Sequence, residues 1–444
     1  MNKNERTENT VRILINLMII GVVTVFFYVI WIKYFRNSIF FFRLGNYMLA
    51  AVYAVTLTVF NSMYGGFSVG AAKTGDILFS QLIALFFTNL VIYMIGTFVN
   101  RMLPAVLPFF LSFLGQFAIV TVLVILGGML FRRIFPAKKT ILVYDREDRS
   151  VYERLIRNQS ARYDVQRSET FSEFVQSPEQ MKEYECILAV GLTPQDKDAL
   201  IRMCYDATKS VYLIPDVYDV IVNSARSVYL LDTPVMKAAG FGPGQLSKIV
   251  KRLFDIFFAL VLLVIASPIC LVTAIAIKLT DGGPVLYKQT RLTQYGRPFE
   301  IYKFRSMRVD AEKDGKARLA SQNDDRITGV GKFIRSCRID ELPQLINILK
   351  GDMSVVGPRP ERPELVEEIL KEVPEFNYRL KVKAGLTGYA QVYGKYNTRL
   401  RDKLLFDLYY IENFSLFLDV RIMFMTFKIL FMKESTEGVE DPGK

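Results

Sequence analysis

The chain has 444 residues, 51% of them hydrophobic, and carries a formal net charge of +12 without a single histidine. The absence of histidine excludes every mechanism that needs a histidine base, together with most zinc and haem sites. Four scattered cysteines with no C-x-x-C pair argue against a disulfide scaffold and fit a reducing compartment. The basic excess suits anionic lipid headgroups or phosphate-bearing substrates. Nucleic acid would suit the charge equally well, but the sequence has no zinc finger, RNA-binding aromatic signature or long basic tract, so we expect no nucleic-acid partner.

Four apolar segments occupy the start of the chain, and each is close to the ~20 residues that span a bilayer as a helix. They cover residues 14–32, 47–64, 77–99 and 103–131. An even number of spans puts both ends on one side, and the basic residues before the first span and after the last favour the cytoplasm. The sequence therefore predicts a four-transmembrane-helix domain over residues 1–135.

Residues 136–243 alternate between strand-like and helix-like runs, which is typical of a small α/β unit with a parallel sheet. The strand-like runs are 140–144, 186–190 and 211–214, and the helix-like runs between them are 152–158 and 196–205. No glycine-rich phosphate loop follows the first strand. We therefore expect a Rossmann-like cytoplasmic α/β domain without a nucleotide, in a regulatory or dimerising role, with a cryptic ligand site as the alternative. Residues 240–244 are the expected linker.

A fifth apolar segment covers residues 253–279 and has Ser267 and Pro268 in its middle. Proline removes a helix hydrogen bond and kinks or breaks the helix. A plain fifth span would move the rest of the chain outside the cell, whereas a re-entrant helix–break–helix would return it to the cytoplasm. Basic residues at both ends of the segment favour the re-entrant form. Ser267 is placed to satisfy backbone groups that the break frees.

The remainder of the chain, to residue 444, is densely patterned. Two β-like runs within residues 284–302 flank a hairpin turn at 294–297. Residues 340–349 are predicted to be helical and to stop at Lys350-Gly351, a basic last turn followed by glycine. Further helices are expected over 363–373 and 397–413, and an amphipathic stretch over 415–431.

Two adjacent carboxylates, Asp340 and Glu341, lie at the start of that predicted helix. Asp340 is expected to be its N-cap. The plain alternative is that Asp340 is only a cap and that Glu341 only compensates the helix dipole in the first turn. Arginines precede the pair at Arg335 and Arg338, and Arg359 follows in a Gly-Pro-Arg-Pro turn. Carboxylates hold metals or act as nucleophiles, and arginines hold phosphates. The pattern indicates phosphoryl chemistry, with a carboxylate as the best nucleophile in a chain without histidine.

A series of short motifs in the last part of the chain resembles the bacterial sugar transferase family, the monotopic polyprenyl-phosphate phosphoglycosyl transferases. These motifs recur in order from about residue 250 to 430 and comprise residues 251–255, 267–268, 283–285, 302–307, 340–345, 350–354, 357–360 and 385–388. The four spans and the α/β unit look like those of the large members of the family. One departure is Ala384, where many relatives carry proline.

The resemblance implies transfer of a sugar phosphate from a UDP-sugar to undecaprenyl phosphate, with UMP leaving. The large relatives start exopolysaccharide, capsule or O-antigen synthesis. By motif, Asp340 would be the nucleophile that forms a covalent phosphosugar intermediate, and Glu341 would assist as an acid/base or by shaping a Mg²⁺ site at Asp340. The resemblance assigns phosphate binding to three basic residues, Lys303, Arg335 and Arg359. It gives Asp419 a supporting role. It also makes Ser267 and Pro268 the re-entrant break of a catalytic domain over residues 244–444.

The fold class expected is thus a multi-pass protein of the bacterial cell membrane with a cytoplasmic catalytic domain of α+β type. Membrane lipid is an expected partner, and a homodimer is plausible by resemblance. A non-catalytic scaffold of a polysaccharide assembly complex is the main alternative. A polytopic transporter is disfavoured, because the chain has only five apolar segments and a large part expected in the cytoplasm. The identity of the sugar is not readable from the sequence.

Overall fold

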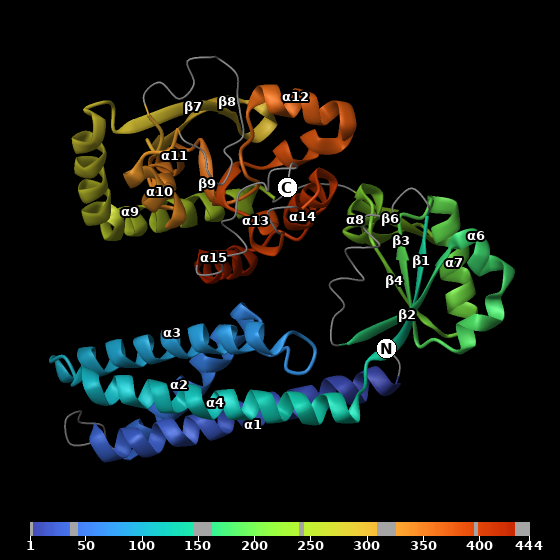
Figure 1. Cartoon of the computed structure of the whole chain (residues 1–444), viewed down its shortest axis with the longest axis horizontal. Coiled ribbons are helices and arrows are strands. Elements are labelled where there is room, and N and C mark those ends of the chain that lie inside the picture. The colour runs from blue at the N-terminus through green and yellow to red at the C-terminus, as the bar shows by residue number, and fades with distance from the viewer. Residues whose placement is uncertain are drawn as a thin grey trace. The chain divides into compact units, whose positions relative to one another are not determined.

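A computed structural model describes residues 3–35, 43–145, 162–238, 244–308, 326–394 and 398–430. The chain divides into two compact units, an N-terminal unit over Met1–Ile214 and a C-terminal unit over Pro215–Lys444 (Figure 1). The described part is mostly helical, and five of its helices are long and apolar enough to cross a membrane. The predicted division into three domains, with boundaries at residues 135 and 243, stays a prediction. The two compact units divide between Ile214 and Pro215.

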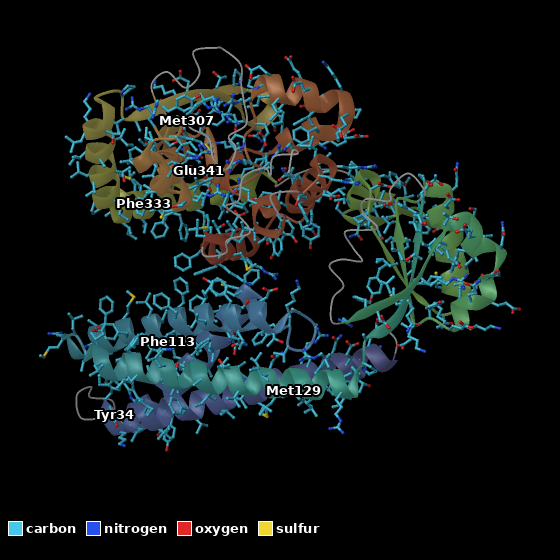
Figure 2. All side chains as sticks on the ribbon, in the orientation of Figure 1. Tyr34, Phe113, Met129, Met307, Phe333 and Glu341 are labelled. Atoms are coloured by element: carbon cyan, nitrogen blue, oxygen red, sulfur yellow. The ribbon has the colours of Figure 1, made fainter. Side chains whose placement is uncertain are left out.

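Each of the four predicted spans near the start of the chain forms a helix. These are α1 (Lys3–Tyr34), α2 (Arg43–Tyr64), α3 (Thr74–Asn100) and α4 (Val106–Ile134). Helix α1 contacts α2 and α4, and α3 contacts the same two neighbours. Buried residues recur every four positions along α1, as at Ile19, Val23 and Phe27, which puts them on one helix face. The side chains that project outward are also largely carbon (Figure 2), as suits helices surrounded by lipid.

A polar group lies inside these four helices. The amide of Gln116 in α4 accepts hydrogen bonds from Tyr53 Oη of α2 at 2.9 Å and from Asn89 Nδ2 of α3 at 2.7 Å. Gln116 Nε2 donates to Ser112 Oγ at 3.1 Å. Hydrogen bonds between helices fix their register where lipid offers no polar partner.

The α/β region confirms the predicted parallel sheet, and it adds one strand. The strands are β1 (Lys138–Tyr144), β2 (Tyr163–Thr170), β3 (Cys186–Val190) and β4 (Ser210–Leu213), in the order β2-β1-β3-β4 and all parallel. The helical elements are α6 (Phe171–Gln176), η2 (Pro178–Lys182) and α7 (Pro194–Asp206). Strand β2 was not predicted, because its edge position leaves most of its side chains polar and partly exposed. The helix predicted at 152–158 lies outside the described residues.

The C-terminal unit begins with elements that the sequence did not predict. They are α8 (Val217–Asn223) and a hairpin of β5 (Arg226–Leu230) and β6 (Thr233–Lys237). Helix α8 packs against α14 (Leu400–Glu412). Ser224 Oγ donates to Glu412 Oε2 at 3.0 Å, and Arg401 pairs with Asp216 at 2.8 Å. The start of this unit therefore belongs to the same compact body as the residues that follow.

The fifth apolar segment forms α9 (Gln245–Asp281), a single helix of 37 residues with Pro268 inside it. The predicted helix–break–helix is thus corrected to one continuous helix, whose ribbon turns sharply in Figure 1. Pro268 has no N–H for the carbonyl of Val264, four residues earlier. Ser267 Oγ instead donates to Val264 O at 2.8 Å. The serine therefore satisfies the backbone group that the proline frees, as predicted.

The rest of the unit confirms most predicted elements. An antiparallel hairpin of β7 (Leu286–Leu292) and β8 (Pro298–Phe304) encloses the short turn η3 (Gln294–Gly296). It is followed by α10 (Gly329–Ser336), η4 (Ile339–Glu341), α11 (Gln344–Lys350), β9 (Met353–Val356), α12 (Pro363–Glu372), η5 (Pro374–Lys381), β10 (Ala384–Thr387), α13 (Tyr389–Tyr393), α14 and α15 (Leu416–Leu430). Strands β9 and β10 are parallel. Leu345, Ile348 and Met353 lie in the core, where α11 and β9 pack against α9.

Candidate active site

The two adjacent carboxylates lie in a tight turn before α11. Arg338 has a φ of 58°, which is left-handed and ends the preceding helix, and residues 339–341 form the one-turn 3₁₀ helix η4. Helix α11 starts only at Gln344, with Pro343 as its N-cap residue. Asp340 is therefore not the N-cap, which corrects the prediction. The predicted C-terminal end of this helix is confirmed, because Gly351 follows Lys350 with a φ of 94°.

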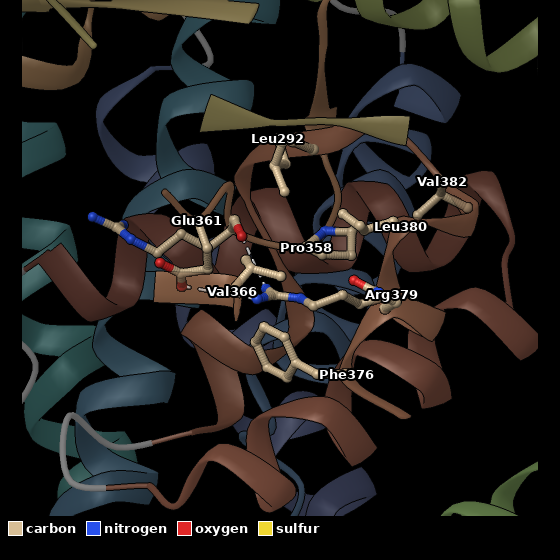
Figure 3. A pocket seen from close by; sticks show the side chains of 11 residues that line it. Leu292, Pro358, Glu361, Val366, Phe376, Arg379, Leu380 and Val382 are labelled. Atoms are coloured by element: carbon tan, nitrogen blue, oxygen red, sulfur yellow. Dashed lines mark hydrogen bonds and ion pairs between the residues drawn. The ribbon is translucent and has the colours of Figure 1, made fainter. Parts of the chain in front are cut away.

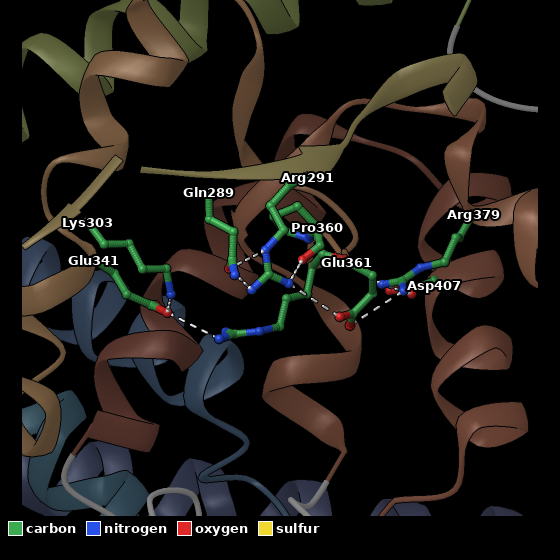
Figure 4. Close-up of polar contacts among 9 residues, drawn as sticks. Gln289, Arg291, Lys303, Glu341, Pro360, Glu361, Arg379 and Asp407 are labelled. Atoms are coloured by element: carbon green, nitrogen blue, oxygen red, sulfur yellow. Dashed lines mark hydrogen bonds and ion pairs between the residues drawn. The ribbon is translucent and has the colours of Figure 1, made fainter. Parts of the chain in front are cut away.

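Glu341 is bound by three cations. Lys303 Nζ donates to its Oε1 at 2.9 Å, and Arg359 Nη2 donates to the same oxygen at 3.2 Å (Figure 4). Arg338 lies 4.0 Å from Oε2. Burial alone would raise the pKa of Glu341, but these cations outweigh it and hold the pKa far below its usual range. Glu341 is thus a permanent anion that draws together Lys303 and Arg359, two of the predicted phosphate-binding residues.

Asp340 differs from its neighbour. It is half-buried, and within the part of the chain that the structure describes its Oδ1 has no hydrogen-bond partner. Burial and the charge of Glu341 raise its pKa, although Lys303, Arg335 and Arg338 oppose the shift. Arg335, in the last turn of α10, is half-buried and close enough to act on the charge of Asp340. The site therefore combines one carboxylate that pairs with three cations and one that has a buried oxygen without a hydrogen-bond partner.

Arg359 extends from a closely packed turn formed by residues 357–361, here called the Arg359 turn. Gly357 N donates to Thr387 O at 2.9 Å, and Gly385 N donates to Pro358 O at 2.9 Å. A Cβ on Gly385 would lie 2.1 Å from Gly357 N, so only glycine allows the two backbones to approach this closely. The neighbouring Ala384 uses its N–H to reach Thr293 Oγ1 at 3.2 Å, a bond that proline could not make.

Asp419 lies in a different group. Its side chain is fully buried, and its two oxygens are bound by Lys251 Nζ at 2.8 Å and by Tyr410 Oη at 2.7 Å. Burial raises its pKa, with Lys251 and Tyr410 opposing. Lys251 also lies 3.8 Å from Asp255, which accepts from Ser354 Oγ at 2.9 Å. These contacts do not support a phosphate-binding role for Asp419; they join the start of α9 to β9, α14 and α15.

Sequence reasoning missed a set of charged residues behind the Arg359 turn. Arg291, Glu361, Arg379 and Asp407 form a connected series of ion pairs. They come from β7, the end of the Arg359 turn, η5 and α14, and no local pattern relates them. Lys251 and Asp255 were seen only as part of a motif, with no role assigned.

A small pocket opens beside the Arg359 turn (Figure 3). Its lining is mostly apolar and includes Leu292, Pro358 and Phe376, with Arg359 and Arg379 among the polar residues. Neither Asp340 nor Glu341 lines it, so it is not the place where those carboxylates would act.

The carboxylates also bear on metal binding. Among the described residues, no three acidic or cysteine side chains are grouped so that they could hold a metal ion. Mg²⁺ is commonly held by one or two carboxylates together with substrate phosphates. The unpartnered Oδ1 of Asp340 fits that arrangement as a single protein ligand.

Comparisons with known proteins give the family. Residues 246–433 match the family described as bacterial sugar transferase. The chain is 39% identical over 236 residues to a UDP-N-acetylgalactosamine-undecaprenyl-phosphate N-acetylgalactosaminephosphotransferase of Aeromonas hydrophila, covering 52% of this chain and 55% of that protein. It is 38% identical over 232 residues to the UDP-glucose:undecaprenyl-phosphate glucose-1-phosphate transferase of Escherichia coli K12, covering 51% and 50%.

The matched part thus spans about half the length of these two relatives. It covers 93% of a shorter relative, an exopolysaccharide production protein of Rhizobium leguminosarum, at 43% identity over 190 residues and 40% of this chain. The family match over residues 246–433 includes every residue of the carboxylate site. The chain belongs to the bacterial sugar transferase family.

Proposed function

We propose that the protein transfers a sugar 1-phosphate from a UDP-sugar to undecaprenyl phosphate at the cytoplasmic face of the cell membrane, and so initiates synthesis of an exopolysaccharide, capsule or O-antigen. The observation that carries the proposal is the pairing of a cation-bound Glu341 with an Asp340 whose Oδ1 is unpartnered. Two relatives are named for transferring N-acetylgalactosamine phosphate or glucose 1-phosphate to undecaprenyl phosphate.

Asp340 is the proposed nucleophile. Its carboxylate oxygen forms a bond to the sugar-bearing phosphorus, and the bond from that phosphorus to the UMP oxygen breaks, so UMP leaves. An oxygen of undecaprenyl phosphate then attacks the same phosphorus and releases Asp340. An oxygen without a competing hydrogen bond supports this role, and a raised pKa makes a carboxylate more basic and therefore more nucleophilic.

Glu341 acts in this scheme as a fixed anion. Its strongly lowered pKa disfavours proton transfer near neutral pH and supports the alternative role of shaping the site. It holds Lys303 and Arg359 side by side, and with Arg335 these cations would bind the phosphate oxygens of the donor. When bound, Mg²⁺ would supply further neutralisation of the diphosphate charge, with Asp340 as its protein ligand.

Helix α9 is proposed to be re-entrant, which keeps the C-terminal unit in the cytoplasm. Both of its arms contact the same fold: Phe258 and Ala259 join the core with α11 and β9, while Cys270 and Ala274 pack against Phe304 and Ile334. A straight span would carry its second half to the opposite side of the membrane. Large apolar side chains on either side of Pro268 are exposed, as insertion of the bend into lipid requires; they include Val264, Ile265, Leu271 and Val272.

The first test is UMP release from purified full-length protein with Mg²⁺, undecaprenyl phosphate and a panel of UDP-sugars. Asp340→Asn is assayed in parallel, with Asp198→Asn as the control because Asp198 forms an exposed surface pair. Release with one sugar, lost in Asp340→Asn alone, is the expected result. Substantial release by Asp340→Asn would contradict the nucleophile. No release with any sugar, together with normal polymer output from an Asp340→Asn strain, would favour a scaffold.

A further inference from the structure

The Arg359 turn is held through its backbone at four successive residues. The carbonyl of Pro358 accepts from Gly385 N of β10, and that of Glu361 accepts from Leu292 N of β7 at 3.1 Å. The two carbonyls between them accept from the side chains of two arginines, of which Arg379 is buried and Arg291 half-buried. Arg379 Nη2 donates to Arg359 O at 2.9 Å, and Arg291 Nη1 donates to Pro360 O at 3.2 Å. The backbone that carries the Arg359 side chain is therefore fixed by three separate elements.

Arg379 is itself held in place by a buried carboxylate. It is 5% exposed, and its Nη2 lies 2.9 Å from Oδ2 of Asp407, which is 1% exposed. Its guanidinium also lies over the ring of Phe376, 4.7 Å from the centroid. A planar guanidinium can bind a carboxylate and a carbonyl at once, which the single ammonium of lysine does poorly. The contacts with Asp407 and Phe376 thus fix the orientation of the Arg379 side chain that binds the Arg359 turn.

Glu361 connects the two arginines behind the turn. Its Oε1 lies 3.8 Å from Arg379 Nη1, and its Oε2 lies 3.7 Å from Arg291 Nη1 (Figure 4). Gln289 Oε1 accepts from Arg291 at 2.7 and 3.1 Å. Two arginines and two carboxylates balance one another in charge, so this partly buried group is neutral as a whole.

The side chain of Arg359 behaves differently from its backbone. It is exposed and reaches across to Glu341, whereas its carbonyl is held by Arg379. A cation that binds a reacting phosphate must be placed to within a fraction of an ångström, because a misplacement of about 1 Å can cost about 100-fold in rate. This short piece of backbone joins Arg379 and Asp407 to the exposed guanidinium of Arg359.

We propose that Arg379 and Asp407 are a positioning pair, which fixes the Arg359 turn so that the Arg359 guanidinium meets Glu341 and a phosphate oxygen of the donor. The inference rests on the proposed function. Neither residue touches the carboxylate site; both act through Arg359. Arg379→Lys keeps the charge beside Asp407 but loses one of its two bonds, so kcat/KM for the UDP-sugar falls about 10- to 100-fold.

A double-mutant cycle tests this route. Arg379→Lys, Arg359→Ala and the double variant are compared with the unaltered protein in the UMP-release assay. If Arg379 acts through Arg359, Arg379→Lys costs about 10- to 100-fold alone but less than about 3-fold when Arg359 is already alanine. An equal cost in both backgrounds, or no cost in either, would overturn the inference. Arg401→Lys is the matched control, since Arg401 pairs with Asp216 at 2.8 Å on the surface.

Hydrogen–deuterium exchange separates this inference from the proposed function, because it needs no substrate. In Arg379→Lys the amides of Leu292 and Gly385, which bond to the Arg359 turn, are expected to exchange faster than in the unaltered protein and in Arg401→Lys. Unchanged exchange would refute positioning even in an active enzyme. Faster exchange would support it even if no UDP-sugar released UMP, a result that would count against the proposed function alone.

Discussion

Two clusters of side chains in the C-terminal unit, one around Asp419 and one around Asp340 and Glu341, each pair a carboxylate with cations. They differ in whether a carboxylate oxygen is left without a partner. Asp419 is fully buried, with one oxygen bound by Lys251 and the other by Tyr410. In the other group Glu341 binds Lys303 and Arg359, while Oδ1 of its neighbour Asp340 has no partner among the described residues. A carboxylate whose oxygens are all occupied can only hold elements together. One with a free oxygen beside cations can bind a ligand or react.

The largest effect is expected for Asp340→Asn, which removes the free oxyanion but leaves the ion pairs of Glu341 intact. Turnover is expected to fall at least about 1,000-fold, as it does when a nucleophile is lost. The midpoint of thermal unfolding is expected to stay almost unchanged, because Oδ1 makes no hydrogen bond that the change would break. Steady-state UMP release and a thermal melt of the same preparation measure both quantities. A large loss of thermal stability would place Asp340 with Asp419, as a structural residue.

Asp419→Asn is expected to give the opposite result. It leaves Lys251 buried with only Asp255 nearby, so the free energy of unfolding falls by about 3 kcal/mol. Activity per folded molecule is expected to remain close to that of the unaltered protein. Chemical unfolding and active-site-normalised turnover check this, with Glu300→Gln as an exposed control. Full stability combined with lost turnover would show that Asp419 belongs to the catalytic group.

Asp407 is a further buried carboxylate that pairs with an arginine, and its titration is measurable. Burial, with help from Glu361, raises its pKa to about 6, although Arg379 and Lys403 oppose the shift. Because the folded protein holds this proton more tightly, the contribution of Asp407 to stability is greatest below about pH 4 and is lost as the pH rises through about 6. Between these two pH values the contribution of Asp407 to the free energy of unfolding falls by about 3 kcal/mol.

Asp407→Asn is expected to flatten the pH dependence of the unfolding free energy between about pH 4 and 7. Unfolding by denaturant at several pH values measures the two curves. Curves that run parallel across this window would show that Asp407 does not titrate there.

The smallest effect is expected for Lys303→Gln, which removes one of the cations on Glu341. The pKa of Glu341 rises, because Lys303 is the main charge that lowers it, and kcat/KM falls about 10- to 100-fold through weaker phosphate binding. Lys288→Gln on the neighbouring strand is the control, since Lys288 forms an exposed pair with Glu300 at 3.2 Å. Equal losses in the two variants would mean that Lys303 has no special part in the site.

The sequence predicted the elements whose signals are local. Turn residues marked the β7–β8 hairpin, apolar length marked the five long helices, and Gly351 marked the end of α11. The N-cap prediction for Asp340 was wrong because the chain turns once more, through a left-handed Arg338, before the helix starts. The carboxylates and their cations were named from the sequence, and three of these cations, Lys303, Arg338 and Arg359, meet at Glu341.

What the sequence could not predict depends on tertiary contacts. Arg379 and Asp407 lie on different elements and carry no shared pattern, so their pairing emerges only when η5 packs against α14. The family resemblance gave Asp419 a supporting role in the site, and its burial beside Lys251 separates it from the carboxylate site. Charge identifies candidates in a sequence, whereas burial and the partners that the fold supplies separate Asp419 from Asp340 and Glu341.

The central claim is that Asp340 is the carboxylate with an oxygen free to react. The most direct test is intact-protein and peptide mass spectrometry after incubation with the UDP-sugar and Mg²⁺ in the absence of undecaprenyl phosphate. We expect a mass gain of one sugar phosphate on the peptide that contains Asp340, with release of about one UMP per protein. An adduct on another residue, or UMP release that occurs only when the lipid acceptor is present, would contradict the account.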